Sequence, residues 1–556
     1  MFPSNIAGLP TWFTIRASKD GYIGRKKEID FLVAMNPETA QEDVMKLDRG
    51  AAVVYDEPLK LNQIRSDLHF YPVPFDKLVG PVCPEAKLRK LVRNMIYDGV
   101  VASLLGIEME EVRRALVKQF GKRKAKAAEL NWGAAQAGYE FAEKTFTKTD
   151  PFRVERMNAT AGKIIIDGNS AAALGAMFAG VTVVTWYPIT PSSSLVEALI
   201  NYLKRFRVDP ETGKATYAVV QAEDELAAVG MVVGAGWAGA RSMTATAGPG
   251  VSLMAEFVGL GYYADVPGVI FDVQRVGPST GLPTRTAQGD LLSTAILSHG
   301  DTKHPMLFPS SPEECFSMAI DAFDLAERFQ TPVFVMLDLD LGMNNWMANP
   351  FPYPEKPIDR GKVLTAEDLD RLGGFARYKD IDGDGVGYRT LPATPHPAAA
   401  YFTRGSGHNE KAQYTEREDD YIHNMDRLAH KFEVMRQFVP KPVVEFNPRA
   451  RIGVICVGTS DYAARESRDQ LRAEYSVESS YLRLLAYPFT SELRDFVRAH
   501  DRVYVVDQNR DAQLLAMMRL EFDPEEIAKL RSVRYYGGLP LDARTLTDEI
   551  VTQEGK

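Results

Sequence analysis

Three segments combine side chains that could bind an anion or move a proton with positions that directly follow predicted strands. The first, residues 187–194, holds two prolines, a threonine and three serines after the strand expected at 181–186. We expect Pro191 to keep Thr190 extended and the serines to cap the next helix, whose free N–H groups favour anions. On residue types alone, an ordinary loop and helix cap is the favoured interpretation of this segment.

The second segment carries Glu223, Asp224 and Glu225, again directly after a predicted strand and at the start of a helix. Acidic residues in a first helical turn are favoured by the helix dipole, which accounts for Asp224 and Glu225 without any catalytic role. A glutamate at a strand end could instead act as an acid–base group. That role requires apolar surroundings that raise its pKa towards working pH.

The third segment runs from Arg275 to Arg285 and contains two glycines and two prolines after the strand expected at 269–274. An arginine that leaves a strand beside the strand leading to Thr190 can form a bidentate pair with a carboxylate. Arg285 could meet a second carboxylate, or it could be a surface charge. The glycines allow the backbone to approach a ligand closely.

The elements that position these segments alternate regularly between helix and strand from residue 163 onward. The expected strands are 181–186, 217–220, 269–274 and 333–339, and the expected helices are 168–180, 194–206, 223–240 and 251–263. This alternation predicts an α/β fold with a doubly wound parallel sheet, in which ligands bind at the carboxyl ends of the strands.

The chain is too long for one hydrophobic core. Changes in residue composition and element pattern along the sequence suggest four regions. Residues 1–150 mix a strand at 51–55 with a charged helical stretch, and 163–350 form the alternating α/β region. Residues 351–448 are rich in proline, glycine and charge, and we interpret them as an irregular excursion that closes with a helix at 420–438. Residues 449–556 form a last α/β unit with strands at 451–458 and 502–507.

Composition excludes several classes of function. The 556 residues carry a formal net charge of −9, with a sequence pI near 5.6 and a mean hydropathy of −0.20. These values argue against nucleic acid or an anionic membrane as a partner. The sequence shows no apolar run of membrane-spanning length and no signal segment, so we expect a cytoplasmic protein. A nucleotide-binding Rossmann enzyme is disfavoured because no GxGxxG follows a first strand.

The cysteines indicate that any electron acceptor lies on another chain. Cys83, Cys315 and Cys456 are far apart and form no CxxC pair, so we expect structural roles and no metal or cluster site. Asp380, Asp382 and Asp384 are spaced like a calcium loop. The twelfth position from Asp380 is Leu391 rather than a glutamate, which argues against calcium.

The motifs resemble those of one enzyme family. Residues 187–193 read YPITPSS, and this string resembles a motif of the 2-oxoacid:ferredoxin oxidoreductases. The run GPSTGLPTR at 277–285 is similar to the members that act on 2-oxoglutarate, and 384–389 and 401–409 resemble another alpha-subunit stretch. Residues 2–12 resemble a motif of the gamma domain that several members fuse ahead of the alpha region. The Gly-rich opening of that domain is missing, so we expect a gamma domain that is incomplete at its N-terminus.

The resemblance implies a thiamine-diphosphate-binding domain of the pyrimidine-side type at 163–350 and a C-terminal transketolase-C-like domain. It assigns Glu223 to the aminopyrimidine N1′, where the carboxylate promotes loss of the thiazolium C2 proton; Glu225 is the alternative. Thr190 and Arg275 would hold the carboxylate of the 2-oxoacid. The other substrate contacts that we carry over are Tyr187, Pro188, Ile189, Ser279, Thr280 and Arg285, with Ile189 also touching the cofactor.

The resemblance also implies partners. A beta subunit would hold the diphosphate with its Mg²⁺ and a [4Fe–4S] cluster, coenzyme A would be the co-substrate, ferredoxin would accept the electrons, and the assembly would be a dimer of alpha–beta pairs. The expected reaction is oxidative decarboxylation of 2-oxoglutarate to succinyl-CoA, or its reverse. The alternatives are pyruvate or a branched-chain 2-oxoacid as substrate, a lipoamide-linked or transketolase-like thiamine enzyme, and a non-catalytic scaffold subunit.

Overall fold

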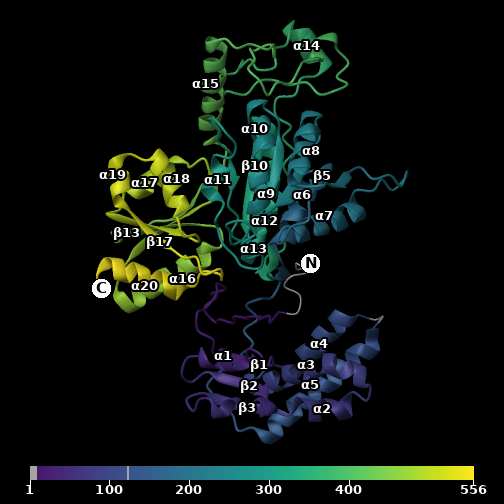
Figure 1. Ribbon diagram of the computed structural model, residues 1–556, viewed down its shortest axis with the longest axis vertical. Coiled ribbons are helices and arrows are strands. Elements are labelled where there is room, and N and C mark those ends of the chain that lie inside the picture. The colour runs from purple at the N-terminus through teal and green to yellow at the C-terminus, as the bar shows by residue number, and fades with distance from the viewer. Residues whose placement is uncertain (1–8, 122–123) are drawn as a thin grey trace. The chain divides into compact units, whose positions relative to one another are not determined.

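The computed structural model describes residues 9–121 and 124–556, which form two compact units (Figure 1). The described residues up to Thr160 make the smaller unit, and Ala161–Lys556 make the larger one. Residues 2–8 of the predicted gamma-domain motif lie outside the described residues. The two units are considered separately below.

The smaller unit is built on a three-stranded parallel sheet in the order β1-β2-β3. Its strands are β1 (Phe31–Ala34), β2 (Ala52–Asp56) and β3 (His69–Val73). Its helices are α1 (Ala40–Met45), α2 (Phe75–Val82), α3 (Ala86–Leu105), α4 (Met109–Phe120) and α5 (Ala125–Thr145), with short 3₁₀ turns at Glu57–Leu59 and Leu61–Gln63. Helices α3 and α5 touch through Gly99 and Gly138. A side chain at either position would overlap a carbonyl oxygen of the other helix.

The main sheet of the larger unit has seven strands in the order β15-β9-β10-β8-β7-β5-β6. Its strands are β5 (Val183–Trp186), β6 (Ala218–Gln221), β7 (Ser242–Thr246), β8 (Gly268–Gln274), β9 (Met306–Leu307), β10 (Pro332–Asp338) and β15 (Ala486–Tyr487). All pair in parallel except β15, which runs antiparallel to β9. The parallel α/β prediction is therefore confirmed.

Helices cover both faces of this sheet, as a doubly wound fold requires. They are α6 (Gly168–Phe178), α7 (Ser193–Phe206), α8 (Glu225–Trp237), α9 (Gly248–Leu253), α10 (Ala255–Tyr263), α11 (Leu291–Ala295), α12 (Pro312–Phe329) and α13 (Leu339–Met343). Alternate residues of β8 enter two different cores: Phe271 packs in the cluster that includes α6, α7 and α12, whereas Ile270 packs with α9, α10 and α11. Strand β8 is buried on both faces for this reason.

Three details of the predicted helices and strand order are wrong. The helix predicted at 251–263 is two helices, α9 and α10, that meet at Met254. Helix α8 begins at Glu225 rather than Glu223, because Asp224 is its N-cap and accepts a hydrogen bond from Ala227 N at 2.7 Å. Strand β8 is not beside β5, because β7 lies between them.

The segment after the main sheet contains β11 (Trp346–Ala348), which pairs antiparallel with β4 (Ile164–Ile166), followed by α14 (Ala366–Leu372), a 3₁₀ turn at Pro397–Ala399 and α15 (Glu418–Met435). Helix α15 is anchored by Arg427 and Lys431, which both pair with the buried carboxylate of Asp265. Asp380 accepts the backbone N–H groups of Gly383 and Gly385, so this carboxylate organises a turn.

The C-terminal part forms a second sheet in the order β12-β14-β13-β16-β17. Its strands are β12 (Val443–Glu445), β13 (Ile452–Val457), β14 (Ser479–Leu484), β16 (Arg502–Asp507) and β17 (Leu530–Arg534). Its helices are α16 (Ser460–Tyr475), α17 (Ser491–Arg498), α18 (Gln513–Glu521), α19 (Pro524–Lys529) and α20 (Ala543–Glu554). Strand β12 comes from the segment predicted as excursion and runs antiparallel to β14.

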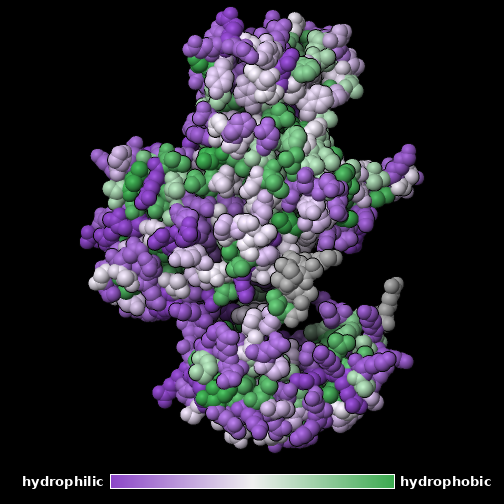
Figure 2. All heavy atoms as spheres, in the orientation of Figure 1, coloured by the Kyte–Doolittle hydropathy of each residue, from purple (hydrophilic) through white to green (hydrophobic). Residues whose placement is uncertain are grey.

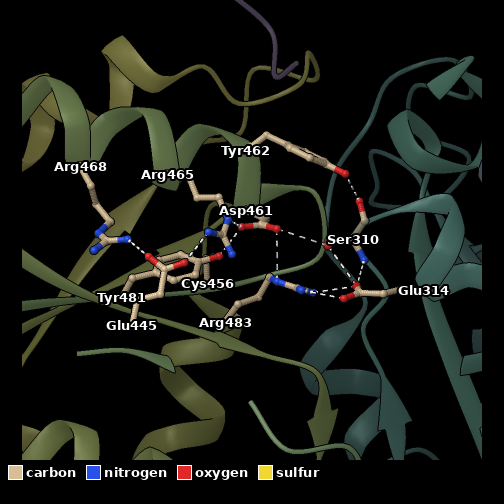
Figure 3. Close-up of polar contacts among 10 residues, drawn as sticks. All are labelled: Ser310, Glu314, Glu445, Cys456, Asp461, Tyr462, Arg465, Arg468, Tyr481 and Arg483. Atoms are coloured by element: carbon tan, nitrogen blue, oxygen red, sulfur yellow. Dashed lines mark hydrogen bonds and ion pairs between the residues drawn. The ribbon is translucent and has the colours of Figure 1, made fainter. Parts of the chain in front are cut away.

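A buried arginine joins the two sheets of the larger unit (Figure 3). Arg483 of β14 donates from its two terminal nitrogens to the carboxylate of Glu314, in the first turn of α12, at 2.7 and 2.8 Å. Its Nε lies 3.3 Å from Asp461, in the first turn of α16. The Tyr462 hydroxyl donates to the Ser310 carbonyl at 2.8 Å. Together with the pairing of β15 and β9, this network fixes the C-terminal sheet against the main sheet.

Candidate active site

The carboxyl ends of β5, β6, β7 and β8 meet at one edge of the main sheet, because these strands are parallel and paired in register. Trp186, the last residue of β5, is opposite Gln221 of β6, and Thr246 of β7 is opposite Asp272 of β8. The three segments singled out from the sequence all leave this edge. Their side chains are therefore close enough to contribute to one site.

The 187–194 segment is a braced loop between β5 and α7. The buried Asn169 side chain of α6 donates from Nδ2 to the Pro191 carbonyl at 2.9 Å, and the same atom lies 2.8 Å from Ser194 Oγ. The Thr190–Pro191 peptide bond is cis. Tyr187 and Pro188 are exposed, whereas Ile189 and Thr190 are partly buried. Asn169 gave no signal in the sequence, because its role depends on a contact 22 residues away.

The predicted serine caps of α7 are wrong. Ser192 occupies the N-cap position but has helical backbone angles, φ −78° and ψ −20°, and makes no side-chain cap. A capping side chain normally requires an extended backbone at this position. The hydroxyls of Ser192 and Ser193 instead donate to the Ile189 carbonyl, both at 3.1 Å. The serines therefore tighten the loop behind Thr190.

The two candidate glutamates have different surroundings. Glu223 lies between β6 and α8 and is exposed, whereas Glu225 is the first residue of α8 and only 6% exposed. This difference in exposure follows from Asp224, which lies between the two glutamates and caps α8. The role predicted for Glu223 requires an enclosed carboxylate. The chain encloses Glu225, the alternative, and not Glu223.

The enclosed side chain of Glu225 rests on the AGPG turn at 247–250. A Cβ built on Gly250 would overlap Thr246 Oγ1 and would lie 2.7 Å from Glu225 Cγ. Glycine at 250 therefore allows the glutamate to lie directly over the backbone that follows β7.

Arg275 links two of the loops. Arg275 is 7% exposed, and its guanidinium donates to the Thr190 carbonyl at 2.6 Å and to the Thr280 carbonyl at 3.1 Å. Arg275 thus reaches the Thr190 loop although β7 separates their strands. Burial lowers the pKa of Arg275 from its usual value, and the charge of Asp290 opposes that shift. Its Nε is buried and has no acceptor among the described residues.

The loop that follows Arg275 folds back as a small hairpin. Val276 N donates to the Arg285 carbonyl at 3.0 Å, and Leu282 N donates to the Val276 carbonyl at 3.0 Å. Ser279, Thr280 and Arg285 are exposed at this hairpin. Gly538 of the C-terminal part packs against it: a Cβ at Gly538 would lie 3.1 Å from that of Arg285.

A polar cluster that the sequence did not indicate lies where strand ends of the two sheets meet. Gln288 donates from Nε2 to Asp338, at the end of β10, at 3.1 Å, and the same atom lies 3.5 Å from Thr459 Oγ1, just after β13. Gln508, just after β16, donates to Thr459 Oγ1 at 3.1 Å. All four side chains are less than 9% exposed. Strand ends of both sheets therefore meet around Gln288.

Other chemistry is confined to buried or dispersed groups. All three cysteines are buried and free. Within residues 9–121 and 124–556, no group of three or more His, Cys, Asp or Glu side chains is placed to hold a metal ion. In the same part of the chain, no helix is both long and apolar enough to cross a membrane.

Comparison with known families gives the class of the protein. Residues 174–360 match the family described as "Pyruvate flavodoxin/ferredoxin oxidoreductase, thiamine diP-bdg", and residues 1–141 match "Pyruvate ferredoxin/flavodoxin oxidoreductase". The first match covers most of the main sheet, from α6 to β10 and beyond. The fold and site therefore define a thiamine-diphosphate-binding α/β domain.

Whole-chain relatives give the family. The alpha subunit of 2-oxoacid:ferredoxin oxidoreductase 2 from Aeropyrum pernix is 32% identical over 93% of this chain and 87% of its own length. The 2-oxoglutarate synthase subunit KorA of Methanocaldococcus jannaschii is 32% identical over 62% of this chain and 88% of its own length. This chain belongs to the 2-oxoacid:ferredoxin oxidoreductase family, as an alpha subunit.

A solved structure matches nearly the whole fold. The 2-oxoglutarate:ferredoxin oxidoreductase from Magnetococcus marinus, solved with 2-oxoglutarate, coenzyme A and succinyl-CoA bound, superposes with a TM-score of 0.85 at 29% identity. The match covers 96% of this chain and 89% of the other chain.

Proposed function

We propose that this alpha subunit serves a 2-oxoglutarate:ferredoxin oxidoreductase, which converts 2-oxoglutarate and coenzyme A to succinyl-CoA and CO₂ or runs in reverse. The observation that carries the proposal is the whole-chain likeness to the Magnetococcus marinus enzyme, whose structure contains 2-oxoglutarate, coenzyme A and succinyl-CoA. Relatives named KorA in three other organisms support the same substrate.

The enclosed carboxylate fits a thiamine cofactor. Glu225 is buried at a strand-end edge, and the absence of a side chain at Gly250 lets the glutamate lie directly against the AGPG turn. Thiamine diphosphate, when bound, would supply the sink for the electron pair that stays on the carbonyl carbon when CO₂ leaves. We assign to Glu225, in place of Glu223, the hydrogen bond to N1′ of the aminopyrimidine. There Glu225 holds the proton whose position promotes deprotonation at C2.

The two loops linked by Arg275 bind the substrate in this proposal. Arg275 and Thr190 receive the 2-oxoacid carboxylate, with Ile189 between substrate and cofactor. The exposed residues Tyr187, Pro188, Ser279 and Thr280 line the entrance. Arg285 is exposed on the same hairpin as Thr280 and receives the second carboxylate that distinguishes 2-oxoglutarate from pyruvate.

A partner subunit completes the site. The beta subunit would hold the diphosphate with Mg²⁺ and a [4Fe–4S] cluster, and ferredoxin would take the electrons; two alpha–beta pairs would assemble. Exposed apolar side chains on α8, at Leu226, Met231 and Trp237, support a docking face there. Figure 2 shows apolar residues gathered over the part of the larger unit where α8 to α10 lie. In this proposal, residues 1–141 are a fused gamma region.

The test is a substrate panel on the complex purified after co-expression with its beta subunit. We expect ferredoxin reduction that depends on both coenzyme A and 2-oxoglutarate, with kcat/KM for 2-oxoglutarate at least tenfold above that for pyruvate or a branched-chain 2-oxoacid. A preference for pyruvate would overturn the substrate assignment. Activity with lipoamide and none with ferredoxin would favour a lipoamide-linked enzyme instead.

A further inference from the structure

Two aspartates at the base of the Arg275 loop form a contact that the proposed chemistry does not use. Asp272 lies in β8, three residues before Arg275, and Asp290 lies where the chain returns from the loop to α11. Asp272 is fully buried, and Asp290 is partly buried. Their carboxyl groups are within hydrogen-bonding reach of one another.

Three of the four oxygens of these carboxyls have no hydrogen-bond donor among the described residues. Both oxygens of Asp272 and Oδ2 of Asp290 receive no N–H or hydroxyl donor from the described residues. Asp290 occupies the N-cap position of α11 yet makes no side-chain cap. An aspartate at this position ordinarily accepts the backbone N–H groups of its helix. Its carboxyl is turned to Asp272 instead.

The surroundings confine the pair. A Cβ built on Gly248 of the AGPG turn would lie 2.6 Å from both oxygens of Asp290, so the turn covers this carboxyl. The other charged group that acts on the pair is Arg275, whose charge lowers the pKa of Asp290. The backbone N–H of Asp290 donates to Gln274 Oε1 at 3.1 Å.

We propose that Asp272 and Asp290 share one proton and so clamp the base of the loop that positions Arg275 and Thr280. Two ionised carboxylates cannot remain in contact in a buried site, whereas a carboxyl and a carboxylate form a strong hydrogen bond. Asp272 and Asp290 are thus positioning residues. The proposal rests on the proposed function, because it assumes that the clamped loop binds the 2-oxoacid.

The electrostatics agree with the geometry. Burial raises the pKa of Asp272 well above its usual value, and the neighbouring Asp290 raises it further. Burial raises the pKa of Asp290 to about 6, although the contact with Asp272 and the charge of Arg275 act in the opposite direction. The shared proton is the one held on Asp272, so the clamp is intact at lower pH and is lost as pH rises through the raised pKa of that carboxyl.

The kinetic test compares the intact complex with Asp290→Asn and Asp272→Asn complexes between neutral and alkaline pH. In the unmodified enzyme we expect KM for the 2-oxoacid to rise with pH, because loss of the shared proton releases the loop that holds Arg275. The rise should be on the order of tenfold, with little change in kcat. An amide at either position supplies a permanent donor, so the KM of each variant should change less than twofold over the same range. Asp98→Asn is the matched control: burial also raises the pKa of Asp98 to about 6, but it lies in α3 of the smaller unit.

A second readout does not depend on activity. Infrared difference spectra of the complex at neutral pH should show a protonated-carboxyl band that both Asn variants lose and Asp98→Asn keeps. An unchanged band, a variant KM that still rises with pH, or a cation bound stoichiometrically at the pair would overturn the proposal. If the band behaves as expected but Arg275→Lys leaves KM unaltered, the clamp stands and the substrate role of Arg275 fails.

Discussion

Arg275 links the two loops proposed to bind the substrate, because its guanidinium donates to a carbonyl in each of them. Arg275→Lys is expected to raise KM for the 2-oxoacid and to lower kcat/KM, because an ammonium cannot reproduce the planar fork of donors. The fall in kcat/KM should correspond to a loss of about 2–4 kcal/mol in transition-state stabilisation. Steady-state kinetics of the co-expressed complex measure the effect. Arg285→Lys, at the exposed arginine proposed to bind the second carboxylate, should lower kcat/KM for 2-oxoglutarate but not for a 2-oxoacid that has only one carboxylate. An unchanged kcat/KM in Arg275→Lys would instead assign the binding of the 2-oxoacid carboxylate to Arg285.

At the residue scale, sequence patterns predicted three segments that the structure brings to one edge of the main sheet, but not which side chain of each segment is enclosed. Glu223 and Glu225 both follow a strand by a few residues, and the choice depends on Asp224 taking the cap of α8. Asn169 and Gln288 carried no local signal, because their partners are 22 and 50 residues away or more. Such contacts become visible only once the strands are placed in order.

At the element scale, the start of α9 is fixed by a glycine that tolerates no side chain. Gly250→Ala would place a methyl group against Thr246 and Glu225, and we expect a loss of unfolding free energy of about 1–3 kcal/mol from overpacking. The displaced Glu225 should also lower kcat. Thermal unfolding and turnover of the complex measure the two effects.

The matched control is Gly234→Ala in α8, where a Cβ would meet open space in this chain. That change should keep or slightly raise the stability of the chain, by at most about 1 kcal/mol, because alanine favours helix. Equal losses of stability in the two variants would contradict the proposed crowding at Gly250.

Element boundaries were predictable where the pattern is local. The β-branched run at 502–507 became β16 with the same bounds, and the predicted strands of the main sheet were displaced by two residues at most. The break at Met254 was not predictable, because the apolar spacing of the two short helices continues across it. Strand order could not be predicted from the sequence either. Strand β7 lies between β5 and β8, which we expected to be neighbours.

At the scale of the whole molecule, the larger unit depends on the joint between its two sheets (Figure 3). Arg483→Met would leave Glu314 and Asp461 without their shared cation, and we expect a loss of about 3 kcal/mol in unfolding free energy. Arg468→Met, which disrupts a more exposed pair with Glu445, should cost less than about 1 kcal/mol. Urea denaturation of both variants checks the difference.

The ion pair between Arg483 and Glu314 should also make the stability of the larger unit depend on pH in the acidic range. Burial acts to raise the pKa of Glu314, but its hydrogen bonds and ion pair with Arg483 more than offset this, so the pKa is lowered. A lowered folded-state pKa stabilises the protein fully above the usual glutamate pKa, and the gain is lost as pH falls through the folded-state value. The unmodified chain should therefore lose stability in that acidic range more steeply than Arg483→Met. Parallel pH curves would contradict this account.

The central claim is that this chain supplies the carboxylate that activates thiamine, and that this carboxylate is Glu225. Hydrogen–deuterium exchange at C2 of the bound cofactor, measured by NMR after acid quench of the reconstituted complex, tests it most directly. Glu225→Gln should slow exchange on the order of 10²–10⁴-fold. Glu223→Gln, two residues away and exposed, should leave exchange within about threefold of the unmodified enzyme, a difference of under 1 kcal/mol. Fast exchange in Glu225→Gln, with slow exchange in Glu223→Gln, would contradict the assignment.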